Sequence, residues 1–468
     1  MSNLILFSTI GIYFCIMIIV GLFALKKRKI GNVTDFFNGG RSLGSLVVIM
    51  TFLATLFSAY TFVGLPGYFY THGIGSFAFM AFIDMLIVIP TYLFGRKVWE
   101  MSKKYDAISP VEILTKRYNS KTVTLLGVLV SVIFTIPILA LQIVGVGKLI
   151  TGVTNGSVSF IFVAAVMLIF ILIYSRLGGM RSVAWTDTLQ GIIMLILIYV
   201  IAFSFLNISF EGSLSNMFSR LIADGQGSLL TLPGPSNFFT YQILISFFFI
   251  FIFIPLYYPL ISQRLIIFKN KKELKKLVLF FPILAFLIFI PTVIIGLGAA
   301  NVFPGLESGD YAFSEVLNLL ENPYISALAV VGIIAAAMSS VDSMLLVVGA
   351  ILSRDLYKRF FRPNASSKKE LWWSTTFIVI TAIIAFIVAL NPPNLIVELG
   401  ILSSAGFVQL VPAYIGGLFW KKVTKFGAIC SIIVGLSSLL VFNYFINPCF
   451  GFHPGFLGLV FGSLTIII

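Results

Sequence analysis

Residues 333–359 read IIAAAMSSVDSMLLVVGAILSRDLYKR and place a cluster of serines and an aspartate within a stretch apolar enough to span a membrane. A carboxylate near the centre of a bilayer costs at least ~2.5 kcal/mol, so Asp342 calls for a functional reason. Helical periodicity places on one face Ala336, Ser339, Asp342 and Ser343, with Ser340 at the flank. Hydroxyl and carboxylate oxygens beside small residues suit a hard cation. Alternatively, the serines donate to carbonyls one turn earlier and the alanines merely allow close helix packing.

The composition is that of a polytopic membrane protein. Of the 468 residues, 59% are hydrophobic and 10% are charged, and many apolar runs of about twenty residues could each cross the ~30 Å hydrocarbon core. The three cysteines and two histidines have no metal or redox spacing. The sequence therefore argues against a metalloenzyme or a disulfide-stabilised protein, and it predicts that the protein is not an enzyme.

Thirteen predicted spans alternate with loops whose charge indicates an orientation. The spans are 3–25, 43–70, 75–95, 123–151, 158–175, 182–206, 238–262, 277–300, 323–352, 372–390, 394–419, 426–446 and 452–468. All lysines and arginines except Lys148 and Arg220 fall in alternate loops, namely 26–41, 96–121, 176–181, 264–276, 354–369 and 421–425. This bias predicts a cell-membrane protein with its N-terminus outside and its C-terminus in the cytoplasm. The net charge of +14 is then a topology signal with lipid headgroups as its partner, and it does not predict nucleic-acid binding.

Two predicted spans are interrupted at corresponding places. Residues 58–67, SAYTFVGLPG, combine polar side chains with glycine and proline, and residues 254–259, IPLYYP, repeat the interruption in the seventh span. Irregular backbone at membrane depth is tolerated where it is buried or lines a cavity. Such breaks in equivalent positions of spans 2–6 and 7–11 favour an inverted-repeat transporter with a midplane site. The alternative is that the prolines only kink the helices.

Further polar residues fall inside predicted spans. Asp187 could face the serine cluster if spans 6 and 9 pack together, or it could cap a helix start beside Arg181. Lys148 has three interpretations: its side chain snorkels to the outer surface, pairs with a carboxylate such as Asp84, or contacts a substrate anion. Asp310, in the external segment 301–322, is expected to be solvated.

Motifs along nearly the whole chain resemble the sodium/solute symporter family, whose members have the leucine-transporter fold. The motifs are FFNGGRSLG at 36–44, GLPG at 64–67, KYDAISPVEILTKRY at 104–118, WTDTLQG at 185–191, ISQR at 261–264 and AAAMSSVDSMLL at 335–346. The resemblance implies an all-α integral membrane protein with about 13 transmembrane helices and one transporter domain over residues 1–468. Within it we expect an extra N-terminal helix (3–25), two inverted five-helix repeats (43–206 and 238–419) and two C-terminal helices (426–468).

The resemblance also implies ion sites. The family's common sodium site corresponds here to the carbonyls of Ala54, Phe57 and Ala336 and the hydroxyls of Ser339 and Ser340. A second cation site, found in some members, corresponds to Asp187 with Ser339, Asp342 and Ser343. This chain has Asp342 where those members have a serine, and two carboxylates around one cation favour tighter ion binding or a shared proton. No cofactor is expected beyond Na⁺ as the coupling ion.

The resemblance implies sodium-coupled import of a small organic solute by alternating access. Segments 141–150, 390–407 and 451–454 are most similar to pantothenate-carrying members, which favours a carboxylate, either pantothenate-like or a monocarboxylate. The candidate substrate-binding residues are Ser58, Thr61, Gln142, Lys148 and Tyr257. The alternatives are a symporter of a proline-like amino acid, a sugar or sialic acid, and a non-transporting sensor with the same fold. The sequence leaves the oligomeric state open.

Overall fold

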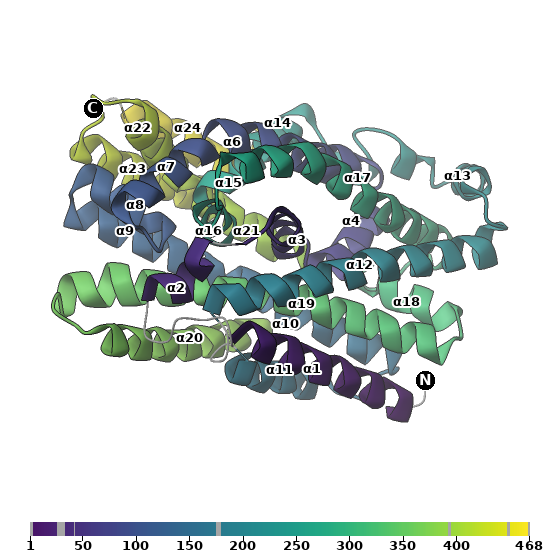
Figure 1. The fold of residues 1–468 in the computed structure, drawn as a ribbon. Helices are drawn as coiled ribbons and strands as arrows, with labels where there is room; N and C mark the ends of the chain where they lie inside the picture. Colours follow the sequence, from purple (N-terminus) through teal and green to yellow (C-terminus); the bar gives the residue numbers. More distant parts are fainter. Residues whose placement is uncertain are drawn as a thin grey trace.

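The computed structural model of the protein describes residues 3–25, 33–41, 43–174, 179–391, 395–446 and 450–466. All regular structure in these ranges is helical, and the helices run side by side in one bundle (Figure 1). The prediction of an all-α protein is therefore confirmed. Parts of several predicted segments lie outside the described residues, namely 26–32 and 175–178 of the basic loops, 392–394 of the motif 390–407, and 447–449 and 467–468 near the C-terminus.

The first half of the chain forms helices α1 (Asn3–Leu25), α2 (Val33–Asn38), α3 (Ser45–Leu56), α4 (Leu65–His72), α5 (Phe82–Leu86), α6 (Val88–Leu93), α7 (Gly95–Tyr105), α8 (Pro110–Tyr118), α9 (Lys121–Ile133), α10 (Thr135–Val153), α11 (Phe160–Tyr174), α12 (Gly179–Phe210) and α13 (Leu214–Ala223). The second half forms α14 (Tyr241–Phe251), α15 (Ile254–Tyr257), α16 (Pro259–Ile266), α17 (Lys271–Val302), α18 (Ala312–Leu319), α19 (Pro323–Ala350), α20 (Ser367–Ala389), α21 (Val397–Phe407), α22 (Val411–Phe419), α23 (Lys425–Tyr444) and α24 (Pro454–Thr465). Three π-helical segments adjoin them: Tyr60–Gly64, Phe77–Ala81 and Ile351–Phe361.

The lengths and composition of the helices bear on the predicted number of membrane spans. Among the described residues, eight helices are long and apolar enough to cross a membrane, and there are up to eleven spans if each of three bent helix pairs counts as one. The predicted spans 158–175 and 452–468 correspond to α11 (Phe160–Tyr174) and α24 (Pro454–Thr465), which are apolar but have fewer than 18 residues within the described ranges. The predicted count of thirteen is therefore not confirmed.

Helix α19 contains the serine cluster and is buried along almost its whole length. Nearly all its side chains over residues 326–350 are buried, and it packs against α12, α10, α1, α20 and α3. The side chain of Asn322 begins the helix by accepting hydrogen bonds from the backbone N–H groups of Tyr324 and Ile325, at 3.0 and 3.1 Å. The polar cluster of α19 is therefore enclosed by protein rather than lipid.

The second predicted span is interrupted at Phe57 and Ser58, at the start of the predicted segment 58–67. Two non-helical residues follow α3, and the segment Tyr60–Gly64 with α4 continues at an angle of 55°. Pro66 is tolerated because it lies in the first turn of α4, where its missing N–H group is not needed. Gly67 allows close packing, because a Cβ atom there would lie 2.8 Å from the carbonyl carbon of Gly309.

The seventh predicted span is interrupted where the sequence indicates. Pro255 lies in the first turn of α15 and Pro259 begins α16, and the helices on either side of this break meet at 44°. Helix α3 packs against α16, α12, α17 and α19, and Figure 1 shows it near the centre of the bundle beside α16. The two broken spans therefore meet each other inside the bundle.

Candidate functional site

The break after α3 leaves backbone carbonyls without their usual helical donors. In an unbroken helix the amide of Ser58 would donate to Ala54 and the amide of Thr61 to Phe57. Here the amide of Ser58 donates to the hydroxyl of Thr61 at 3.1 Å, and the amide of Thr61 donates to the carbonyl of Ser58 at 2.8 Å. The carbonyls of Ala54 and Phe57, both predicted sodium ligands, are therefore released from the helix. Thr61 has a local structural role here.

A third carbonyl is released because Gln142 of α10 reaches the break. Its side-chain oxygen accepts the amide hydrogen of Ala59 at 3.1 Å, and its side-chain nitrogen donates to the hydroxyl of Ser58 at 3.1 Å. The carbonyl of Thr55 consequently loses its own helical donor, Ala59. Gln142 therefore fixes the geometry of the break.

The serines of α19 meet these free carbonyls. Ser339 Oγ lies within hydrogen-bonding distance of the carbonyl oxygens of Ala54 (2.7 Å) and Ala336 (2.8 Å), and Ser340 Oγ donates to the carbonyl of Thr55 at 3.3 Å. All five residues are buried. Four of the five predicted sodium ligands thus lie together in a set of neutral oxygens, and the fifth, Phe57, belongs to the same break. We name the residues Ala54, Phe57, Ala336, Ser339 and Ser340 the oxygen cluster.

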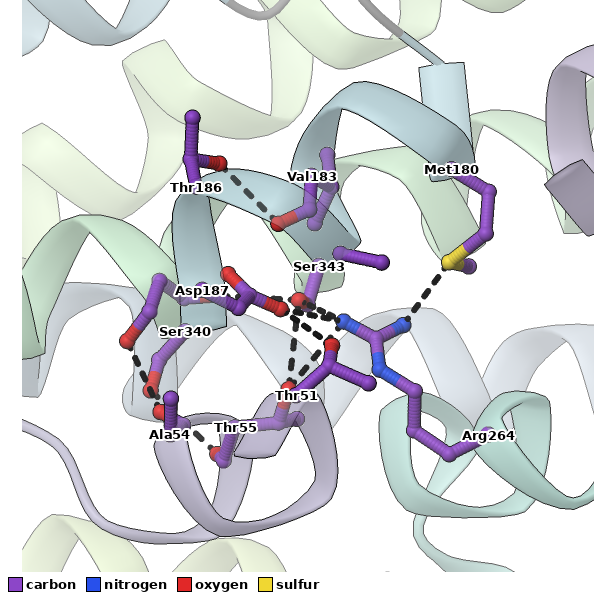
Figure 2. Close-up of polar contacts among 12 residues, drawn as sticks. Thr51, Ala54, Thr55, Met180, Val183, Thr186, Asp187, Arg264, Ser340 and Ser343 are labelled. Atoms are coloured by element: carbon purple, nitrogen blue, oxygen red, sulfur yellow. Dashed lines mark hydrogen bonds and ion pairs between the residues drawn. The ribbon is translucent and has the colours of Figure 1, made fainter. Parts of the chain in front are cut away.

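A guanidinium lies beside the oxygen cluster. Arg264 Nη2, from α16, lies 3.1 Å from Asp187 Oδ2 of α12 and 3.1 Å from Thr55 Oγ1 of α3, and it also donates to Ser343 Oγ of α19 (Figure 2). Thr51 donates to the same carboxylate oxygen. The side chains of Arg264 and Asp187 are fully buried. Four helices are therefore linked through one arginine.

Sequence reasoning missed this role of Arg264, which it assigned to the cytoplasmic loop 264–276. The signal was the ISQR motif directly after the broken span. The condition under which Asp187 could face the serine cluster, contact between spans 6 and 9, is met, because α12 packs on α19. The alternative for Asp187 is wrong, since it lies well inside α12 and Arg181 pairs with Asp35 at 3.3 Å.

Asp342 stands apart from the arginine. Its side chain is buried, with 3% of its surface exposed. Within the described part of the chain it makes no hydrogen bond or ion pair, and its Oδ2 atom is buried without a partner. The structure therefore brings Asp187 and Ser343 of the predicted second cation site together around Arg264, but it does not bond Asp342 to them.

A cavity adjoins the break and encloses about 650 Å³ of empty space, part of it open to solvent. Ser58 and Gln142, two of the predicted substrate-binding residues, line it, whereas Thr61, Lys148 and Tyr257 are not part of its wall. The hydroxyl of Tyr257 donates instead to the carbonyl of Ile250 at 2.5 Å. The other lining residues are Thr55, Leu56, Tyr60, Phe79, Met80, Asp84, Ile138, Leu141, Phe251, Ile254, Tyr258, Ser340, Met344, Val397, Gly400, Ile401 and Ser404. Thr55 and Ser340 connect this cavity to the oxygen cluster.

Lys148 pairs with a carboxylate other than the predicted Asp84. Its Nζ atom lies 2.6 Å from Asp310 Oδ2, and the same oxygen accepts the amide hydrogen of Ile396 at 3.0 Å. Asp310 was expected to be solvated, but it is 2% exposed, and burial raises its pKa to about 6 although the charge of Lys148 opposes the shift. Because Lys148 has this partner and lies outside the cavity wall, the argument for a substrate anion beside it loses its support.

We expect this buried ion pair to stabilise the fold. Lys148→Ala leaves Asp310 buried and uncompensated and should lower the free energy of unfolding by about 3–5 kcal/mol, measured by thermal or denaturant unfolding in detergent. Asp310→Asn in the same background should recover part of the loss, since it removes the unpaired charge. Arg220→Ala is the control, because Arg220 forms an exposed pair with Glu211 at 3.9 Å. Additive losses in the double variant would contradict the coupling.

Comparisons with known proteins agree with this geometry. A sequence profile of the Sodium:solute symporter family matches residues 36–435. The Sodium/pantothenate symporter of Haemophilus influenzae is 26% identical over 462 residues, covering 98% of this chain and 94% of that protein. The osmoregulated proline transporter OpuE of Bacillus subtilis is 28% identical over 454 residues, covering 92% and 87%. The predicted similarity to pantothenate-carrying members is thus confirmed.

Solved structures show the same fold. A Na⁺-coupled sialic acid symporter in a substrate-bound outward-open state superposes with a TM-score of 0.81 at 20% identity, covering 99% of this chain and 96% of that one. The nucleobase-cation-symport-1 family transporter Mhp1 gives a TM-score of 0.61 at 14% identity, covering 93% and 94%. The predicted fold is confirmed, and the named relatives are transporters rather than enzymes. The profile covers most of the chain, and this protein therefore belongs to the sodium:solute symporter family.

Proposed function

We propose that this protein imports a small organic solute together with one sodium ion, which the oxygen cluster binds. The observation that carries the proposal is the contact of Ser339 Oγ with the freed carbonyl of Ala54, at 2.7 Å, and with the carbonyl of Ala336 in its own helix, at 2.8 Å. Neutral carbonyl and hydroxyl oxygens are suitable ligands for a hard cation. Because the ligands come from α3 and α19, a bound ion would hold the two helices together and favour one arrangement of the bundle.

Sodium binding and solute binding are coupled because the oxygen cluster and the solute cavity meet at the same residues. Thr55 and Ser340 both line the solute cavity, and they are bonded to each other at the edge of the oxygen cluster. An ion that orders this wall raises solute affinity, and the solute raises ion affinity by the same factor. Each sodium ion that enters through ~100 mV supplies about 2.3 kcal/mol, which corresponds to accumulation of nearly fiftyfold at ~1.4 kcal/mol per decade.

The proposed stoichiometry of one sodium ion rests on Arg264. Its guanidinium contacts Asp187, Ser343 and Thr55, so a fixed positive charge lies among the ligands that the sequence assigned to a second cation. A sodium ion placed there would have to displace the arginine and overcome its repulsion. The proposal therefore expects transport to depend on sodium with a Hill slope near one.

With Asp342 included, this region contains one guanidinium, that of Arg264, and two carboxylates, those of Asp187 and Asp342. A buried carboxylate without a partner is strongly disfavoured unless a proton or a cation neutralises it. We therefore expect Asp342→Ser to change the pH dependence of uptake or its slope against sodium, and Asp187→Asn to alter the same quantity non-additively. Uptake measured over a grid of pH and sodium concentration tests this, with Asp224→Asn as a control, since Asp224 pairs with Asn301 at the surface. Independent effects of the two variants would show that Asp342 does not share its charge balance with Asp187.

The orientation is also proposed, with the N-terminus outside and the C-terminus in the cytoplasm. Supporting this, basic segments that are distant in sequence contact one another: Lys271 Nζ lies 2.8 Å from Glu100, and Arg117 donates to the carbonyl of Lys421 at 3.3 Å. Figure 1 marks the two chain ends at opposite ends of the bundle. Alternating access would then rock the spans that contain the two breaks against the remaining helices.

Two classes of solute remain candidates for transport. The relatives named for pantothenate favour a carboxylate, and those named for proline favour an amino acid. The described residues of the cavity wall include no lysine, arginine or histidine, but they include the carboxylate of Asp84. Both solutes carry a carboxylate, and only the amino acid also carries an ammonium group that can meet Asp84, so the wall favours the second class.

Uptake by purified protein in proteoliposomes tests the proposal. Radiolabelled pantothenate and proline are presented with an inward sodium gradient, with equal sodium on both sides, and with potassium replacing sodium. We expect accumulation of one of them only with the gradient. Uptake that is equal in all three conditions would refute sodium coupling.

A further inference from the structure

One carboxylate lines the solute cavity. Asp84 belongs to α5, and its side chain is partly exposed to the cavity rather than packed away. Helix α5 belongs to the segment Phe77–Leu93, which forms one half of a bent candidate span, so the carboxylate lies within the membrane-spanning part of the protein. In the part of the chain that the structure describes, Asp84 has no hydrogen bond and no ion pair.

Two buried basic residues of the bundle are already paired. Arg264 lies 3.1 Å from Asp187, and Lys148 lies 2.6 Å from Asp310. Neither of these basic residues lines the cavity, and none of the described lining residues is a lysine, arginine or histidine. An intramembrane carboxylate is expected to have a partner, and the described protein side chains do not supply one for Asp84.

The rest of the wall suits an organic cation. Tyr60, Phe79, Phe251 and Tyr258 line the same cavity as Asp84, and the faces of aromatic rings attract cations. The hydroxyl of Tyr60 donates to the sulfur of Met80 at 3.0 Å, so it is directed away from a role as donor to the carboxylate. Sodium already has the oxygen cluster, which offers several oxygen ligands and adjoins the cavity through Ser340.

We propose that Asp84 binds a positively charged nitrogen of the transported solute, so that the solute is a small amine or zwitterion with an apolar body. This inference rests on the proposed symport function and specifies its substrate class. The ammonium group would take the place of the missing protein cation at Asp84, and the apolar part would lie against the aromatic wall. A solute without a cationic nitrogen would leave the carboxylate desolvated and unpaired, and this penalty makes Asp84 the residue that selects the solute.

The first test compares solutes that differ only in the charged nitrogen. Thermal unfolding of the purified full-length protein is followed in saturating sodium with matched pairs, for example L-proline against tetrahydrofuran-2-carboxylate, together with further small amines and pantothenate. We expect stabilisation by members that carry the cationic nitrogen and none by their oxygen analogues. Stabilisation confined to compounds without a cationic nitrogen, or by no amine in the panel, overturns the assignment.

The second test separates charge from shape. Asp84→Asn keeps the shape of the side chain but removes its charge, and it should weaken binding of the stabilising amine about a hundredfold or more, whereas Asp84→Glu should recover part of the affinity. Glu307→Gln, an exposed carboxylate outside the cavity, is the matched control and should leave affinity unchanged. Wild-type affinity in Asp84→Asn refutes the ionic contact, because a protonated aspartate acting as a neutral donor is imitated by asparagine.

Stabilisation by sodium alone distinguishes the two proposals. It should be the same in the wild type and in Asp84→Asn, since the oxygen cluster is intact in both. Loss of sodium stabilisation in the variant would assign Asp84 to the ion rather than to the solute and would overturn this inference. Absence of sodium stabilisation in the wild type would instead refute the proposed sodium site.

Discussion

Replacing both Ser339 and Ser340 with alanine should abolish sodium-dependent uptake. Each hydroxyl contacts a carbonyl of the break after α3, with Ser339 Oγ 2.7 Å from Ala54 and Ser340 Oγ 3.3 Å from Thr55. Alanine supplies no oxygen in place of the lost hydroxyl, and the neighbouring hydroxyls of Thr51, Thr55 and Ser343 are already bonded around Asp187 and Arg264. A polar contact to a charged group is worth about 1.5–3 kcal/mol, so each single variant should raise the sodium concentration for half-maximal uptake by about tenfold or more.

The measurement is uptake as a function of sodium, together with thermal unfolding in sodium and in potassium. Ser326→Ala is the matched control, because Ser326 is a buried serine of the same helix that lies outside the oxygen cluster. Ser340→Thr keeps a hydroxyl and should retain more sodium affinity than Ser340→Ala. Wild-type sodium dependence in the double alanine variant would remove the proposed ion site.

Removing Arg264 should strongly destabilise the fold. Arg264→Ala leaves Asp187 fully buried with only the hydrogen bond from Thr51 that the structure records for it, and breaking a buried ion pair in this way costs about 3–5 kcal/mol of unfolding free energy. We also expect sodium to compensate in part, because removal of the guanidinium exposes the oxygens of Asp187 and Ser343 to a cation. The variant should therefore be unstable in potassium, recover at high sodium, and show a steeper sodium dependence than the wild type.

Unfolding curves at several sodium concentrations test this expectation. The double variant Asp187→Asn with Arg264→Gln carries neither charge and should be more stable in potassium than Arg264→Ala. Arg181→Ala is a suitable control, because its pair with Asp35 is less buried, with 19% of the Arg181 side chain exposed. An Arg264→Ala protein that is as stable as the wild type in potassium would show that the pair contributes nothing to the fold.

The sequence by itself determined the class of the protein and most of the oxygen cluster. Apolar runs of about twenty residues are the length that crosses a bilayer. In lipid such a run must satisfy its backbone hydrogen bonds internally, which a helix does, so the all-α membrane class follows from composition alone. The serines of α19 were identified because polar groups are expensive in an apolar span. Their partners Ala54 and Phe57 came from motif resemblance, since nothing in the residues near a break says which carbonyls lose their donors. The tertiary structure assigns that loss to the positions of Thr61 and Gln142.

Only the tertiary structure decided which charges are paired. The sequence placed Arg264 in a cytoplasmic loop and Asp310 at the surface. The distribution of charges along a chain indicates on which side of the membrane a segment lies, but it does not indicate whether a side chain points into the protein. Packing of α16 between α3, α8 and α19 buries Arg264 against Asp187, and the segment around Gly309 carries Asp310 to Lys148 through contacts between residues distant in sequence. With those cations paired, Asp84 remains as the carboxylate of the solute cavity. Burial and pairing are properties of the packed helices, and for that reason the sequence alone could name these residues but could not assign their partners.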